Sequence, residues 1–97
     1  MSRSKNTQSK HDSQVRKEVK KLDNAGYNVK ADIPGYKQPD TIGGYRPDYV
    51  AKKGGKKIIG EVETHDSVAS SRDQKQQKAF EQAAKRSKNT SFKRTIT

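Results

Sequence analysis

A chain of 97 residues, of which 27% are hydrophobic, has room for one small domain with a thin core. Its net charge of +11 favours a polyanionic partner, and nucleic acid is the usual partner of such a chain. The lack of cysteine excludes disulfides and thiolate metal sites, and no apolar run is long enough for a membrane span or a secretory signal. We therefore expect a cytoplasmic protein, or a nuclear one if the host has a nucleus, with no membrane partner.

The amino-terminal part is predicted to contain a basic arm and a helix. Residues 1–11 are mostly Ser, Lys, Asn and Gln without an apolar period, which indicates a disordered arm that lies on phosphate or serves only as a solubilising tail. From Asp12 or Ser13, apolar residues recur at helical spacing up to the stop at 25–26. Glu18 lies at the edge of that stripe, where it either reaches a sheet beneath the helix or pairs with Lys17 or Lys21 in solvent.

The middle of the chain is predicted to form a strand at 27–33, a turn-rich loop at 34–44 and then a hairpin. Gly54-Gly55 suits a two-residue hairpin turn, because glycine adopts positive φ at both central positions. That turn makes Asp48 face Glu61 across the two strands, about 5 Å apart at Cβ. Glu63 follows on the same face because side chains alternate along a strand. A bulge or a displaced turn would separate Asp48 from Glu61 instead.

A second helix is expected from Ser71 or Asp73 to Arg86 or Ser87, followed by a last strand at 91–97. Gln76 shares the apolar face of this helix with Ala79, Phe80 and Ala83, so it either meets a polar partner or lies partly exposed at the edge. The element order predicts an α/β fold, a small mixed sheet flanked by two helices in the order α-β-β-β-α-β, over residues 12–97.

Three neighbouring carboxyl groups predict a divalent-cation site. Mg²⁺ or Mn²⁺ is the expected cofactor, because both prefer oxygen ligands and no thiol is present. Asp48 and Glu61 are the candidate protein ligands. Bound metal would turn a coordinated water into a nucleophile, and Glu63 could accept the proton of that water as a general base.

The same residues resemble the PD-(D/E)XK nuclease superfamily in its small Holliday-junction-resolvase-like or restriction-endonuclease-like form. Pro47-Asp48 matches the PD half and Glu61-Val62-Glu63 occupies the (D/E)XK half on the next strand. Glu18 corresponds to an acidic residue that many members carry on the first helix, and the segment from Gln76 to Phe80 is similar to a QxxxY element. The resemblance implies a Mg²⁺-dependent or Mn²⁺-dependent endonuclease acting on DNA, with the Val62 carbonyl as a third metal ligand.

The chain departs from the family pattern at one position, since Glu63 stands where lysine is usual, although some restriction endonucleases carry glutamate there. Two other functions therefore stay open: a nucleic-acid-binding module of the same fold without catalysis, and a small basic RNA-binding protein. Phosphate contacts are predicted for basic residues of the hairpin tip and second helix, and the small size suggests a homodimer. The predicted nucleic-acid-binding residues are Lys52, Lys53, Lys56, Lys57, Arg72, Lys75 and Lys78.

Overall fold

The computed structural model describes residues 5–64 and 71–97, and it describes the side chains of residues 9–64 and 74–97. Within these ranges the elements are α1 (Lys5–Asn24), β1 (Asn28–Ala31), β2 (Tyr49–Lys53), β3 (Lys56–Glu63), α2 (Ser71–Arg86) and β4 (Thr90–Ile96). The strands form one sheet in the order β1-β2-β3-β4. β1 and β3 both run antiparallel to β2, whereas β4 runs parallel to β3. The predicted α/β fold is confirmed.

The β2–β3 hairpin turns at the predicted glycines. Gly54 and Gly55 both have positive φ, 51° and 88°, which a side chain would strain. Lys53 pairs with Lys56 next to the turn, and Val50 pairs with Ile59 further along, as the sequence predicted.

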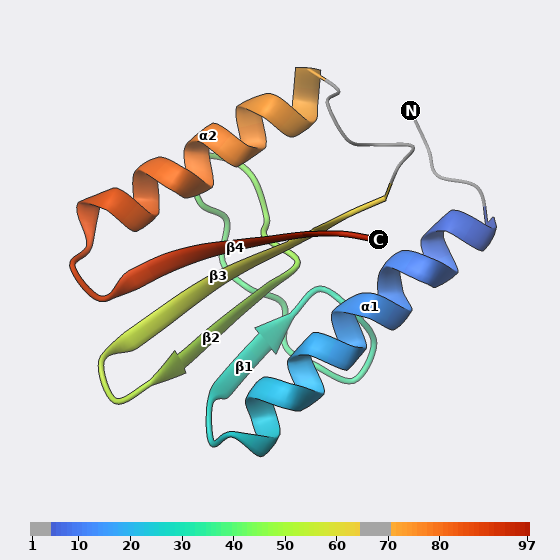
Figure 1. Cartoon of the computed structure of the whole chain (residues 1–97), viewed down its shortest axis with the longest axis horizontal. Helices are drawn as coiled ribbons and strands as arrows, with labels where there is room; N and C mark the ends of the chain where they lie inside the picture. Colours follow the sequence, from blue (N-terminus) through green and yellow to red (C-terminus); the bar gives the residue numbers. More distant parts are fainter. Residues whose placement is uncertain (1–4, 65–70) are drawn as a thin grey trace.

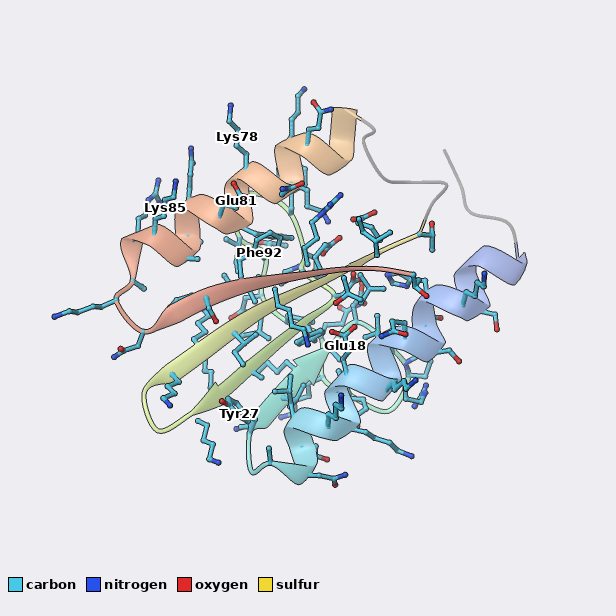
Figure 2. The ribbon with its side chains drawn as sticks, viewed as in Figure 1. Glu18, Tyr27, Lys78, Glu81, Lys85 and Phe92 are labelled. Carbon is cyan, nitrogen blue, oxygen red and sulfur yellow. The ribbon has the colours of Figure 1, made fainter. Side chains whose placement is uncertain are left out.

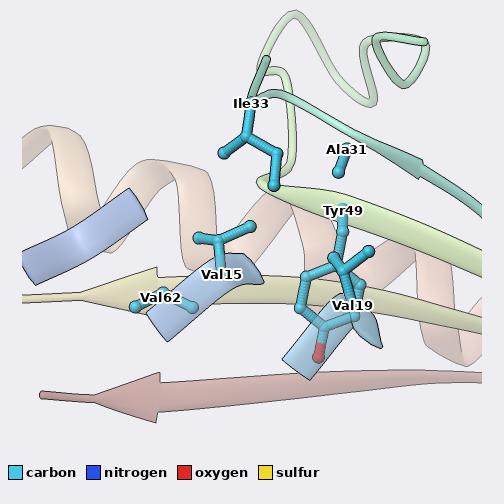
Figure 3. Close-up of a cluster of buried hydrophobic side chains, with 6 residues drawn as sticks. All are labelled: Val15, Val19, Ala31, Ile33, Tyr49 and Val62. Atoms are coloured by element: carbon cyan, nitrogen blue, oxygen red, sulfur yellow. The ribbon is translucent and has the colours of Figure 1, made fainter. Parts of the chain in front are cut away.

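The two helices lie on opposite sides of the sheet (Figure 1). On the α1 side, Val15 and Val19 of the helix pack against apolar residues of the strands and the following loop (Figure 3). Gly60 is essential to this side, because a Cβ there would come within 2.0 Å of the Tyr49 ring. The buried members of this core are Val15, Val19, Ala31, Ile33, Tyr49 and Val62.

On the α2 side, Phe80 is fully buried and its ring lies 5.7 Å from that of Phe92 on β4. Lys78, Glu81 and Lys85 point away from the sheet, whereas Phe92 lies between β4 and α2 (Figure 2). The helix spans the predicted residues, and on the predicted face Phe80 is buried while Gln76, Ala79 and Ala83 are half-buried. Side chains alternate along β3, so Val62 faces α1 while Glu61 and Glu63 face α2.

The predicted disordered arm at 1–11 is wrong from Lys5 onward, since α1 begins there and not at Asp12 or Ser13. The reason is visible at His11, which is only 4% exposed and lies one helical turn before Val15. The buried stripe therefore continues through a histidine, and no helix breaker precedes it. Residues 1–4 of the arm, and the segment 65–70 expected to be irregular, lie outside the described residues.

The strand and loop boundaries shift slightly from the predicted ones. β1 is shorter than the predicted 27–33, and the connection from β1 to β2 covers residues 32–48. In the described part of the chain, no helix combines the length and the apolar character needed to cross a bilayer.

Candidate functional site

Asp48 lies just before β2 and joins the hairpin out of register. Its backbone N–H donates to the Gly60 carbonyl over 3.1 Å, although Gly60 already pairs with Tyr49, so Asp48 and Tyr49 form a β-bulge opposite one residue. The prediction that Asp48 faces Glu61 within the ladder is therefore wrong. The physical reason is Pro47, which has no N–H to extend the ladder.

The Asp48 side chain accepts a hydrogen bond from β3 that a backbone carbonyl would accept in a regular ladder. Its Oδ2 accepts a hydrogen bond of 2.7 Å from the N–H of Val62, the residue between Glu61 and Glu63. Because the N–H and C=O of one strand residue point the same way, the Val62 carbonyl also points to the side of β3 on which Asp48 lies. The bulge thus brings the Asp48 carboxylate and the Val62 carbonyl to one place at the start of β2.

Glu61 and Glu63 are buried acids, 5% and 3% exposed. Gln76 of α2 is half-buried and donates from Nε2 to Glu61 Oε1, so of the two alternatives it meets a polar partner while staying partly exposed. Glu61 Oε2 is also buried, and no described residue donates a hydrogen bond to it. A buried carboxylate oxygen without a donor is costly unless the group is protonated or meets a cation.

The environment of Glu61 raises its pKa to about 10. Burial is the largest cause, followed by the negative charge of Asp48, and then by the hydrogen bond and charge of Glu63, while the Asp48 backbone amide acts in the opposite direction. The carboxyl groups of Asp48, Glu61 and Glu63 therefore interact electrostatically, although Asp48 is not paired with Glu61 in the ladder. A pKa raised this far favours the protonated, neutral form of Glu61 at neutral pH when no cation is bound.

The donor set around Asp48 fits a hard divalent cation. Two carboxylates and one carbonyl are all oxygen donors, and Mg²⁺ takes its other ligands from water and substrate phosphate. The described residues contain no group of three or more His, Asp or Glu side chains placed to hold a metal. The protein would accordingly contribute Asp48, Glu61 and the Val62 carbonyl, with a proton leaving Glu61 when the ion enters.

His11 is a neighbour of this site that sequence reasoning missed. Its Nε2 lies 3.1 Å from Asp48 Oδ1, and its Nδ1 lies 3.1 Å from Asp12 Oδ1. The spacing of four residues between His11 and Val15 was the available signal, because it continues the buried face of α1 toward the carboxyl end of the predicted arm.

Glu18 is buried, so its alternative interpretation as a solvated residue paired with Lys17 or Lys21 is wrong. It lies between α1 and the sheet (Figure 2), on the opposite face from Glu61 and Glu63. Its carboxylate contacts polar side chains of three elements, α1, β2 and β4, rather than joining the acids near Val62. These partners are Tyr49 Oη at 3.2 Å, Thr95 Oγ1 at 3.1 Å and Gln14 Nε2 at 3.3 Å, with Lys93 Nζ at 3.4 Å as an ion pair.

The Glu18 carboxylate also affects the pKa of Tyr49. Burial, together with the charge and hydrogen bond of Glu18, raises the pKa of the Tyr49 hydroxyl, so Tyr49 remains a donor. Glu18 therefore positions Tyr49 over Gly60, directly behind the strand that carries Glu61.

The predicted phosphate-binding residues occupy two regions. Lys52, Lys53 and Lys56 are exposed and Lys57 is half-buried at the hairpin tip, while Lys75 and Lys78 are exposed on α2. The side chain of Arg72 lies outside the described ones.

The chain matches no protein-family model, and no curated protein or solved structure is similar enough to count as a match. Its functional assignment therefore rests on the geometry of the chain itself.

Proposed function

We propose that the protein is a metal-dependent nuclease of the PD-(D/E)XK type, an endonuclease that hydrolyses DNA phosphodiester bonds with Mg²⁺ or Mn²⁺. The observation that carries the proposal is Glu61, a buried acid with one oxygen that no described residue satisfies, next to Asp48 and Glu63. A structural carboxyl would ordinarily be paired, whereas a metal ligand needs a free lone pair. The net charge of +11 supports a polyanionic substrate.

The roles of the residues follow from their contacts. Asp48 is held by the Val62 N–H, and Glu61 by Gln76, so both carboxylates are oriented before substrate arrives. A bound divalent cation supplies an acidified water and neutralises charge on the phosphate. Glu63, buried beside Glu61, accepts a proton in this scheme. Glu18 is a positioning residue on the other face, acting through Tyr49.

The second candidate is a nucleic-acid-binding module of the same fold without catalysis. The specific observation in its favour is Glu63 at the position where this type of site usually carries lysine, so the side chain at that position offers no ammonium group to stabilise a hydroxide. The hairpin lysines would bind phosphate in either case.

A cleavage assay on supercoiled plasmid and branched DNA, with Mg²⁺ or Mn²⁺, separates these candidates. Wild type should cut, while Asp48→Asn and Glu61→Gln should bind the same DNA without cutting. Glu81→Gln is the matched control, because Glu81 is exposed on α2 and contacts Gln77. If wild type binds DNA and cuts neither substrate, the binding module stands; a preference for structured RNA would favour an RNA-binding protein.

A cytoplasmic homodimer completes the proposal. β4 lies at the edge of the described sheet and carries Ile96, which is 47% exposed. An unpaired edge with an exposed apolar residue is a surface that a second copy can cover. Sedimentation analysis of wild type and Ile96→Lys tests this part, since only the variant should be monomeric.

A further inference from the structure

A hollow of about 580 Å³ opens at the tip of the β2–β3 hairpin, at the other end of the hairpin from Asp48. It is walled by the hairpin turn, the start of β1 and the connection from α2 to β4. Five lysines surround it, and none of its described lining residues is acidic. The lining residues are Asn28, Lys52, Lys53, Gly54, Gly55, Lys56, Lys57, Ser87, Lys88, Asn89 and Thr90.

The arrangement of the lysines around this hollow destabilises the sheet. Lys53 lies directly opposite Lys56, and Lys52 directly opposite Lys57, so two successive cross-strand pairs carry like charges. Like charges at directly opposed positions destabilise a sheet. Such an arrangement is explained if an anion neutralises it in the functional state of the protein.

One of these lysines has a structural role. Lys53 Nζ donates to the Ala25 carbonyl over 2.6 Å and lies 5.5 Å from the centre of the Tyr27 ring, which ties the hairpin to the end of α1. The hollow lysines other than Lys53 are therefore the candidates for an external anion.

The hollow and the candidate metal site lie along one strand. Lys57 and Glu61 are four residues apart on β3 and alternate onto the same face, which separates their Cα atoms by roughly 13 Å at 3.3 Å per residue. Successive phosphates of one duplex strand advance about 3.4 Å along the helix axis, so this distance corresponds to about four nucleotides.

We propose that the hollow is a second phosphate site, which holds the backbone of a nucleic-acid strand about four nucleotides from the bond at Asp48 and Glu61. The register relative to the cut rests on the proposed nuclease function, whereas the phosphate site itself does not. Lysine ammonium groups bind phosphate as point charges and do not read bases, so the site adds affinity without sequence choice.

The test is the salt dependence of binding to a fluorescent 20-base-pair duplex, without divalent metal so that cleavage is not required. The variant Lys52→Gln/Lys57→Gln should bind more weakly, and its slope of log affinity against log salt should fall by about 1.8, or 0.9 for each lost phosphate contact. The control Lys20→Gln/Lys37→Gln removes the same charge from exposed positions outside the hollow, and its slope should stay within 0.5 of that of wild type.

The melting temperature is a second readout, and a variant that merely misfolds would not give the expected increase. Removing the Lys52–Lys57 repulsion should raise the melting temperature at low salt, whereas the control should leave it unchanged. Lys56→Gln, which removes one member of the other like-charge pair, should show the same two effects at about half the size in the salt slope.

Equal salt slopes for the hollow variant and the control would overturn the proposal. So would displacement of the duplex by inorganic phosphate beyond that caused by chloride at equal ionic strength, because the hollow would then be a site for a small free anion. If the slope falls as expected while no DNA is cut under any condition, the phosphate site stands and the nuclease function fails.

Discussion

Replacing Glu61 by glutamine should change how the stability of the protein depends on pH. The folded-state pKa of Glu61 is raised to about 10, against an ordinary value of 4.5. Between these values the folded protein holds a proton that the unfolded chain has lost, so the contribution of this group is fully present below pH 4.5 and is lost as the pH rises toward 10. Glutamine mimics the neutral acid and cannot ionise.

The size of the effect follows from the same values. Each pH unit in this window changes the free energy of unfolding by at most about 1.4 kcal/mol, so wild type should lose up to about 3 kcal/mol relative to Glu61→Gln between pH 4.5 and pH 7. Coupling to Asp48 and Glu63 makes this an upper bound, because those groups share the repulsion.

Urea unfolding at pH 5, 6, 7 and 8, without divalent metal, measures the difference. Glu61→Gln should become increasingly more stable than wild type as the pH rises, while Glu81→Gln, altered at an exposed position, should follow wild type. A constant difference between Glu61→Gln and wild type over this range would show that Glu61 is already ionised in the folded protein, and the reasoning would fail.

Three further predictions follow from the same geometry. Affinity for Mn²⁺ should increase up to tenfold per pH unit between pH 6 and pH 8, because Glu61 must release a proton to the solvent; calorimetry in buffers of different ionisation enthalpy detects that proton, and a pH-independent affinity would contradict it. Gly60→Ala should destabilise the fold by about 3 kcal/mol or more in thermal denaturation, since its Cβ would overlap the Tyr49 ring, and a melting temperature near that of wild type would refute the packing. Tyr49→Phe should cost about 2 kcal/mol by removing a donor to Glu18 while leaving Mn²⁺ affinity unchanged, and a large loss of Mn²⁺ binding would instead place Glu18 in the metal site.

The features that were predictable from sequence are those set by local chemistry. Gly54-Gly55 defines the hairpin and its register, because two positive φ values admit few other connections. The helical wheel of α2 placed Gln76 on the apolar face, where a polar partner was one of two alternatives, and the half-buried amide has Glu61 as its partner. Both inferences needed only residues that are neighbours in one element or across one turn.

The features that were missed depend on contacts between distant parts of the chain. Asp48 leaves the ladder because Pro47 has no N–H to donate to it. The position of the Asp48 carboxylate is then set by the hydrogen bond that it accepts from the N–H of Val62. His11 contacts Asp48, a residue distant in the chain, whereas composition alone placed His11 in a disordered arm. Glu18 meets Thr95 from the last strand, a pairing that no local pattern encodes.

The central claim is that Asp48 and Glu61 together bind one divalent cation. Electron paramagnetic resonance of Mn²⁺ titrated into the full chain with a non-cleavable phosphorothioate duplex tests it most directly. The account predicts one bound Mn²⁺ per chain for wild type and Glu81→Gln, and loss of that ion in Asp48→Asn and in Glu61→Gln. Equal Mn²⁺ uptake by all four proteins, or uptake by none of them, would contradict it.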